Sequence, residues 1–108
     1  MNECVIVGQL KSMPEISSVG NGVPVANLIV ESDRNFRNED GTFGTDVFRV
    51  SVWRGQAEQA ANLLKPGDMI AIRGRLSGRA VKKEDRTNYF TEVIAESVEY
   101  LHELNRRA

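Results

Sequence analysis

The chain has 108 residues, of which 41% are hydrophobic and 27% charged, a balance typical of one globular domain with a single core. This balance excludes a fully disordered chain. The formal net charge is -1, so the bulk basicity typical of polyanion-binding proteins is absent, and any such site would need locally segregated charge.

The chain offers few residues for thiol or metal chemistry. Cys4 is the only cysteine and His102 the only histidine, so we expect no internal disulfide, no Cys/His metal cluster and no cofactor. The N-terminal stretch MNECVIVGQL carries an acid where a signal peptide needs positive charge. No stretch approaches the ~18 to 20 apolar residues of a membrane span, so we expect a cytoplasmic protein without membrane contact.

Alternating apolar and polar residues, the pattern of half-buried strands, occupy residues 4–10, 23–32 and 47–54. The first two are separated by KSMPE and by a glycine-rich turn at 19–22. The residues expected to face the core in the second and third strands are Ala26, Leu28, Val30, Phe48, Val50 and Val52. The alternate residues Val47, Arg49, Ser51 and Trp53 are expected to face outward.

The helical period occurs once, over residues 56–64, where the apolar stripe is formed by Ala57, Ala60, Ala61 and Leu64. Alternation resumes over 69–77, with Ile70, Ile72 and Leu76 expected inside. Gly74 interrupts this row, as expected at a bulge or a barrel corner. A basic stretch at 78–86 then leads into a last strand at about 88–98.

The predicted order is three strands, one helix and two strands. Closing five strands into a barrel removes exposed edges, and a five-stranded Greek-key barrel with one short helix between strands 3 and 4 is the OB-fold arrangement, an all-β class. A split α+β sheet is the alternative that periodicity leaves open. We expect a single domain over 1–108, with a core at about 1–101 and a short C-terminal extension at 102–108.

Four stretches resemble the bacterial single-stranded DNA-binding protein family in their order and spacing: NECVIVGQLKSMPEI, NGVPVANLIVESDRN, LLKPGDMIAIRGRL and TEVIAESVEYL. The most specific parts are NG-x-x-VAN at 21–27 and KPG-x-x-x-x-IRGRL at 65–76. The resemblance implies a non-catalytic OB-fold protein that binds single-stranded DNA without marked sequence preference, in replication, recombination or repair. It also implies a nucleoid-associated homo-oligomer, with a tetramer expected and a dimer as the alternative.

Such a protein needs aromatic surfaces for bases and cations for phosphates. By resemblance, Phe36 and Trp53 fall at base-stacking positions, and Arg49 and Arg79 fall at strand-contacting positions. We expect residues 33–44 to form a long loop with Asp40-Gly41 at its turn. The complete set of expected DNA contacts is Arg34, Phe36, Arg37, Arg49, Trp53, Arg54, Arg73, Arg75, Arg79, Lys82, Lys83 and Arg86.

Charge is segregated along the sequence, because residues 73–86 hold six basic residues against two acids, while the next stretch is acidic at Glu92, Glu96, Glu99 and Glu103. Individual residues keep other interpretations. Phe43 is expected to pack onto the barrel, Trp53 would face the core if the register slipped by one, and the basic residues at 82–86 are equally explained as a solvated hairpin tip.

Two departures from the family pattern affect the expected function. Val47 and Val81 stand where many members carry tryptophan, so affinity per nucleotide should be lower. After Leu101 the chain closes with HELNRRA, without the acidic, Phe-terminated tip by which typical members recruit other enzymes, so we do not expect that recruitment. A short paralogue, a mobile-element or phage version and a trimmed chain would each explain this ending.

Two other classes of function stay open. A primosomal-type OB-fold adaptor, acting mainly through protein partners, shares the fold and short length. An oligomeric interaction domain whose basic face meets an acidic protein would use the same cations. An enzyme is disfavoured because no serine elbow, paired acid and base, P-loop or metal constellation occurs in the sequence.

Overall fold

The computed structural model describes residues 1–103 of the chain, with side chains to residue 101. Its elements in chain order are β1 (Cys4–Leu10), β2 (Glu15–Val19), β3 (Val23–Arg37), β4 (Phe43–Trp53), α1 (Gly55–Leu63), β5 (Asp68–Lys82) and β6 (Thr87–Glu103). Of the expected extension at 102–108, the first two residues continue β6, and residues 104–108 lie outside the described part.

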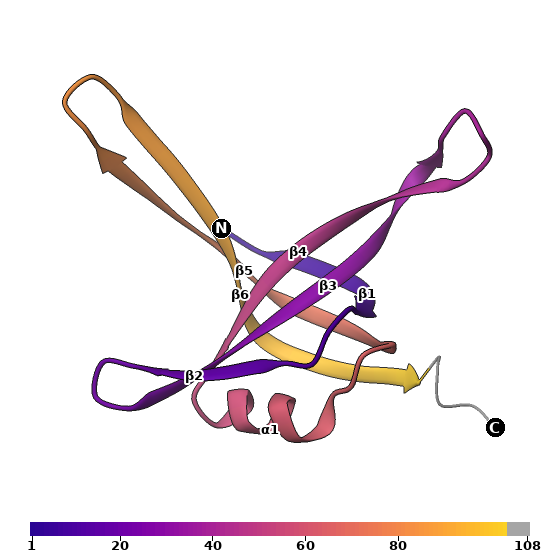
Figure 1. Ribbon diagram of the computed structural model, residues 1–108, viewed down its shortest axis with the longest axis horizontal. Coiled ribbons are helices and arrows are strands. Elements are labelled where there is room, and N and C mark those ends of the chain that lie inside the picture. Colours follow the sequence, from indigo (N-terminus) through magenta and orange to yellow (C-terminus); the bar gives the residue numbers. More distant parts are fainter. Residues whose placement is uncertain (104–108) are drawn as a thin grey trace.

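The strands close into a barrel. Their order is β1-β5-β6-β4-β3-β2, and an additional pairing of β1 with β3 completes a ring of five strands. All pairs are antiparallel except β4 with β6, which run parallel. The helix lies between the third and fourth strands of this ring and covers one end of it (Figure 1). The five-stranded barrel is therefore confirmed, and the split α+β sheet is wrong.

The sequence pattern missed one strand, β2. It pairs with β3 from Glu15 opposite Asn27 to Val19 opposite Val23, while the end of β1 pairs further along β3, with Leu10 opposite Val30. Thus β1 and β2 follow one another along the same partner strand. All five residues of β2 are exposed, so no buried face imposes an alternation that the sequence could reveal.

The core agrees with the predicted inward faces of β3, β4 and β5, with two differences. The residues that are fully or almost fully buried include Ala26, Leu28, Val30, Val50, Val52, Ile70 and Ile72, and Phe48 packs partly buried against them. Leu76 is exposed, although predicted inside, because β5 leaves the barrel after Gly74. Ser51 is buried, although predicted outside, because it is short and its partners Asn27 and Ile94 carry longer side chains.

The helix packs the predicted stripe onto the open end of the barrel, with Ala61 only half-buried. Ala57, Ala60 and the following Leu64 are buried in the same core cluster as the strand residues. A helix of nine residues is too short to be stable alone, so this docking holds it. It ends where the Leu64 amide donates to the Ala60 carbonyl, ahead of Pro66.

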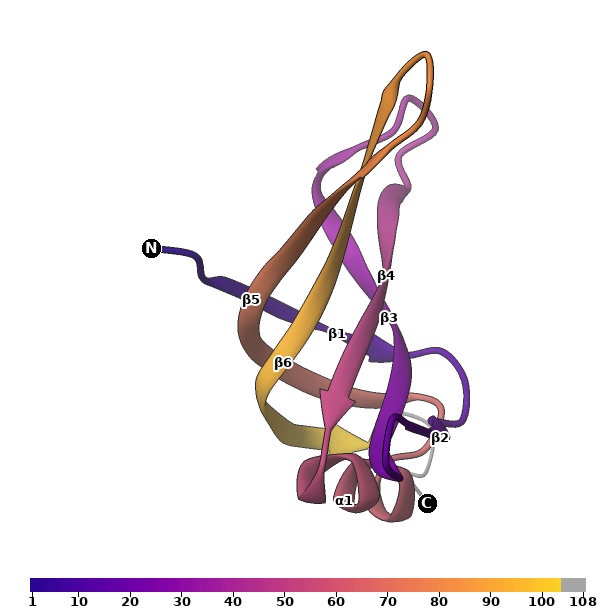
Figure 2. The same cartoon turned by 90° about the vertical axis from the view of Figure 1, so that its left-hand side faces the viewer.

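Two hairpin arms extend from the end of the barrel opposite α1, as Figure 2 shows. The first joins β3 to β4, so the long loop expected at 33–44 is wrong: only residues 38–42 are turn, with Gly41 at φ 87 as predicted for Asp40-Gly41. The second joins β5 to β6, and most of the basic stretch at 78–86 is strand. The sequence hid both arms because water reaches both faces of each ribbon, which removes the period of two.

Gly74 permits the close approach of β5 and β6 at the point where the barrel bends. The register between the two strands shifts there, and a Cβ at residue 74 would lie 2.1 Å from the Ile94 carbonyl oxygen. Since that neighbour is backbone, no side-chain rotation relieves the clash. The predicted bulge at Gly74 is confirmed.

We predict that Gly74→Ala lowers the free energy of unfolding by about 2 kcal/mol or more, because the strands must separate to admit the methyl group. Urea unfolding followed by circular dichroism measures this. Gly78→Ala is the matched control on the same strand, since its Cβ would meet only the Phe90 carbonyl oxygen, at 3.8 Å. Equal stability of Gly74→Ala and Gly78→Ala would contradict the prediction.

Candidate nucleic-acid interface

A groove opens where β4 and β6 separate. The two strands pair only at Val50 with Val93 and at Ser51 with Ile94, and beyond these pairs they diverge into the two arms (Figure 1). The resulting inter-arm groove has a volume of about 640 Å³. Its lining residues are Val47, Phe48, Arg49, Leu76, Ser77, Arg79, Phe90, Thr91, Glu92 and Val93.

The groove brings together two of the expected DNA-contacting residues, Arg49 from β4 and Arg79 from β5. The guanidinium carbon of Arg79 lies 5.3 Å from the centroid of the Phe90 ring, a cation–π contact. Glu92 is the acid among the lining residues. The acidic stretch of the sequence is therefore only partly separated from the cations in space.

The β3–β4 arm carries Arg34, Phe36 and Arg37. The Phe36 side chain is 61% exposed and lines a second hollow beside β1. Arg34 forms a 3.0 Å ion pair with Asp46, and Arg37 donates to the Gly41 carbonyl at 3.3 Å. Both cations thus have partners within the arm, and Phe36 is the exposed aromatic side chain between them.

Phe43 does not pack onto the barrel, contrary to the expectation. It lies opposite Arg37 near the turn of the β3–β4 arm, and the Arg37 guanidinium carbon is 4.9 Å from its ring centroid. The ring is 47% exposed. Its position beyond the barrel end removes it from the core, so the arginine is its packing partner.

Arg73 and Arg75 do not lie beside Arg49, because β6 separates β5 from β4. Two strand spacings amount to about 10 Å across the sheet. Arg73 also lies 3.8 Å from Glu3, a solvent-exposed pair that contributes little to stability. The continuous basic face expected from β4 and β5 is therefore interrupted.

Trp53 and Arg54 lie at the α1 end of β4. Trp53 is 38% exposed, and its neighbour Val52 is buried, so the predicted outward register of β4 holds at this residue. It lies on the same strand face as Arg49, about 13 Å away at the rise of a strand. Arg54 adopts φ 63 and donates its amide to the Pro24 carbonyl, which ties the start of α1 to β3.

The remaining cations, Lys82, Lys83 and Arg86, are exposed at the tip of the β5–β6 arm. The Lys83 amide donates to the Arg86 carbonyl at 2.7 Å and closes the turn. The structure thus distributes the expected residues over the groove, both arms, the barrel and the α1 end of β4. Arg49 and Arg79 share the inter-arm groove, and Arg34 and Phe36 share the hollow beside β1.

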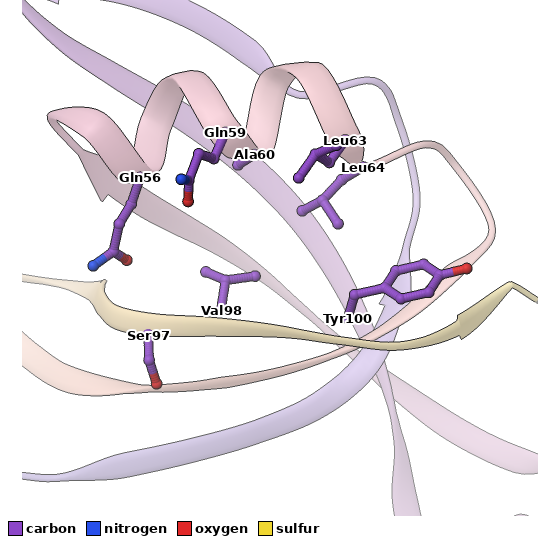
Figure 3. Close-up of a pocket in the computed structure, with 8 residues that line it drawn as sticks. All are labelled: Gln56, Gln59, Ala60, Leu63, Leu64, Ser97, Val98 and Tyr100. Atoms are coloured by element: carbon purple, nitrogen blue, oxygen red, sulfur yellow. The ribbon is translucent and has the colours of Figure 1, made fainter.

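Sequence reasoning missed a pocket between α1 and β6, shown in Figure 3, with a volume of about 560 Å³. Its lining residues are Gln56, Gln59, Ala60, Leu63, Leu64, Ser97, Val98 and Tyr100. None of these is charged, so the pocket lacks the cations that phosphates need. The sequence signal that could have indicated this pocket is Leu63, an apolar residue directly before Leu64 of the helical stripe, which is exposed in the structure.

The turn of the β3–β4 arm is organised around Asp40. The Thr42 hydroxyl donates to its carboxylate at 2.6 Å and the Thr42 amide donates at 3.1 Å. These hydrogen bonds, the hydroxyl one first, lower the pKa of Asp40 below its ordinary value. The ionised carboxylate therefore favours the turn above the ordinary pKa, and this contribution is lost as pH falls through the lowered one.

The helix and the acidic side chains of the described part of the chain bear on membrane and metal binding. No helix there is long and apolar enough to cross a membrane. No group of three acidic, histidine or cysteine side chains gathers there in a way that could hold a metal ion.

The chain belongs to the single-strand binding protein family, whose model matches residues 1–101. A single-stranded DNA-binding protein of Halalkalibacterium halodurans is 41% identical over 102 residues, which are 94% of this chain and 61% of that protein. This chain spans 61–63% of the length of four such relatives. The resemblance inferred from the sequence motifs is thereby confirmed.

Two solved structures share the fold. A deletion mutant of the single-stranded DNA binding protein from Thermus aquaticus matches with a TM-score of 0.76 and 26% identity, over 98% of this chain and 52% of that one. Plasmodium falciparum SSB, solved in complex with ssDNA, matches with a TM-score of 0.75 and 20% identity over 94% of this chain and 95% of that one. The second match supports the OB-fold only.

We predict that Thr42→Val raises the pKa of Asp40 toward its ordinary value of about 3.9, because the variant lacks the hydroxyl donor. Carboxyl-detected NMR titration measures this directly. Thr45→Val is the control, since Thr45 lies on β4 outside the turn, and the hydrogen bonds that Asp40 accepts come from Thr42. The same pKa in wild type and Thr42→Val would contradict the hydrogen-bond explanation.

Proposed function

We propose that the protein binds and protects single-stranded DNA without marked sequence preference, during replication, recombination or repair. Family membership over residues 1–101 is the observation that carries the proposal. The inter-arm groove, with Arg49 and Arg79 on its walls, supports it. No catalytic step and no cofactor are involved, because the mechanism is passive: the bound strand is kept from re-annealing.

Two kinds of contact supply the binding free energy. Arginine contacts to phosphates release counterions and make the affinity fall as salt rises. Aromatic rings stack on bases of any sequence and depend less on salt. We assign the first kind chiefly to Arg49 and Arg79, and the second to Phe36 and Trp53.

The remaining expected contacts extend this path. On the β3–β4 arm, Arg34 and Arg37 would contact phosphates. In doing so they would give up the solvent-exposed ion pair of Arg34 and the hydrogen bond of Arg37 within the arm, which contribute little to stability. Lys82, Lys83 and Arg86 would do so at the other tip, and Arg73, Arg75 and Arg54 on the barrel. A near-neutral protein can bind a polyanion in this way because cations line the path even though the total charge is low.

We further propose that the chain is a homo-oligomer, with a tetramer expected and a dimer as the alternative. Val5 on the outer face of β1 is 69% exposed, and Val7 on the same face is exposed as well. Between Cys4 and Gly8, β1 pairs only with β5 within the described residues. An apolar strand with one open edge is the kind of surface that a second chain covers.

Location follows from the proposed role. A protein that protects single strands acts where they form, so we infer a nucleoid-associated protein of the cytoplasm. Its partners are single-stranded DNA and further copies of itself.

We predict that oligo(dT) quenches Trp53 fluorescence strongly, that the matching duplex does not, and that the affinity for oligo(dT) falls with added salt. Titrations with both nucleic acids at low and moderate salt measure all three effects. Trp53 is the single tryptophan, so the signal reports one site. Absence of tight binding to either nucleic acid would overturn the proposed function.

Variants in the same titration separate the two kinds of contact. Arg49→Ala should lower the slope of log affinity against log salt by about 0.7, the value for one phosphate contact on a single strand. Phe36→Leu should weaken binding at least about fivefold with little change in that slope. Lys65→Ala removes an equal charge beyond the expected contacts and is the control. If neither Arg49→Ala nor Phe36→Leu changed the affinity, the allocation would be wrong.

We predict that Val7→Glu dissociates the oligomer, because the β1 face would then carry a repelling charge on each chain. Light scattering coupled to size-exclusion chromatography measures the mass, which for a tetramer is four times the chain mass of 12.0 kDa. Val81→Glu, on the β5–β6 arm, is the control. A monomeric wild type, or an unchanged mass for Val7→Glu, would contradict the proposed interface.

A further inference from the structure

Phe90 lies on the wall of the inter-arm groove, directly opposite Arg79 in the ladder of the β5–β6 arm. Its ring is 47% exposed, although a phenylalanine of this size contributes to stability when it is buried. It does not belong to the core cluster of the barrel. We propose that Phe90 is a base-stacking site, whose ligand is a nucleobase of the single strand; this inference rests on the proposed function.

The ring is held in place before any ligand arrives. Pairing continues without interruption from Leu76 opposite Val93 to Lys82 opposite Thr87, so the register fixes where Phe90 lies. The Arg79 guanidinium carbon lies 5.3 Å from the ring centroid, a cation–π contact that favours this position of the ring. A platform that is ordered in the absence of DNA costs little additional entropy on binding.

The chemistry around the ring suits a base with its phosphate. Arg79 beside the ring and Arg49 on the opposite wall supply donors for phosphate oxygens. Glu92 lies on the same wall as Phe90, and its carboxylate disfavours a phosphate there, which leaves that wall for the uncharged base. Stacking on an aromatic ring is tolerant of sequence because every base has a flat face.

The groove distinguishes Phe90 from Phe43. Both rings lie opposite an arginine at a similar distance, and both are 47% exposed. Phe43, however, lies beside the turn of its arm and is not among the residues lining the groove. Only Phe90 faces a second cation across a hollow that is large enough for a nucleotide.

A purely structural role for Phe90, as the packing partner of Arg79, makes a different prediction. In that case, loss of the ring would lower the stability of the arm, but no base would stack on the ring when DNA binds. The test therefore needs a direct report from residue 90 in addition to an affinity.

The experiment compares Phe90→Leu with Tyr89→Leu, using oligo(dT) and fluorescence anisotropy over a range of salt concentrations. Tyr89 is the adjacent, highly exposed aromatic residue and is not among those lining the groove. We expect Phe90→Leu to weaken binding at least about fivefold at every salt concentration, with an unchanged salt slope. Tyr89→Leu should stay within about twofold of wild type.

The second arm of the experiment introduces Phe90→Trp into a Trp53→Phe background, so that residue 90 carries the single tryptophan. Stacking of a base on that ring should quench its emission when oligo(dT) binds. A circular dichroism spectrum like that of the wild type shows that the variant is folded. Affinity in this background should remain close to that of Trp53→Phe alone, because an aromatic ring is kept at residue 90.

Either of two results would overturn the inference: Phe90→Leu binding like Tyr89→Leu, or no quenching at residue 90 while oligo(dT) is bound. A wild-type chain that fails to bind oligo(dT) would overturn the proposed function itself. Wild-type binding combined with either of those two results would overturn only the stacking site.

Discussion

The short parallel pairing between β4 and β6 determines most of what this molecule presents to a ligand. Two residue pairs, Val50 with Val93 and Ser51 with Ile94, are enough to close the five-stranded ring. Because the pairing stops there, each strand continues with its other neighbour as a hairpin, and the two hairpins diverge. The same contact therefore completes the core on one side and opens the inter-arm groove on the other.

The distribution of charge follows from this geometry. β6 lies between β4 and β5 in the sheet. The cations of β4 and β5 are therefore separated by the side chains of β6, which include acids and Ile94. Cations of β4 and β5 line one hollow where the two arms diverge, at Arg49 and Arg79. A near-zero net charge is thus compatible with a local phosphate site, although long-range attraction of a nucleic acid would be weaker than for a basic protein.

Sequence patterns predicted the barrel well and the arms poorly. Where one face of a strand is buried, as in β3 from Ala26 to Val30, alternation is imposed by the core and can be recognised. In β2 and in both arms water reaches both faces, so the pattern carried no such signal. The resemblance to the family predicted Arg49 and Arg79 as DNA contacts, but Phe90 became a candidate only when its register opposite Arg79 and its position in the groove were known.

The two arms also show why hairpins suit this kind of site better than the loop expected for residues 33–44. A flexible loop would lose backbone entropy for each residue that a bound strand ordered, at roughly 1 to 2 kcal/mol per residue. In the β5–β6 arm an uninterrupted ladder has already fixed the backbone. In the β3–β4 arm the pairing is irregular between Asp33 and Arg37 and resumes where Arg37 lies opposite Phe43. Arg79 and Arg37 lie over the rings opposite them. Under the proposed function, binding exchanges weak, solvent-exposed side-chain contacts for contacts with phosphates and bases. If Phe90 stacks on a base as proposed, it offsets part of the stacking surface that Val47 and Val81 do not supply, because a ring that is already in position loses little entropy on binding.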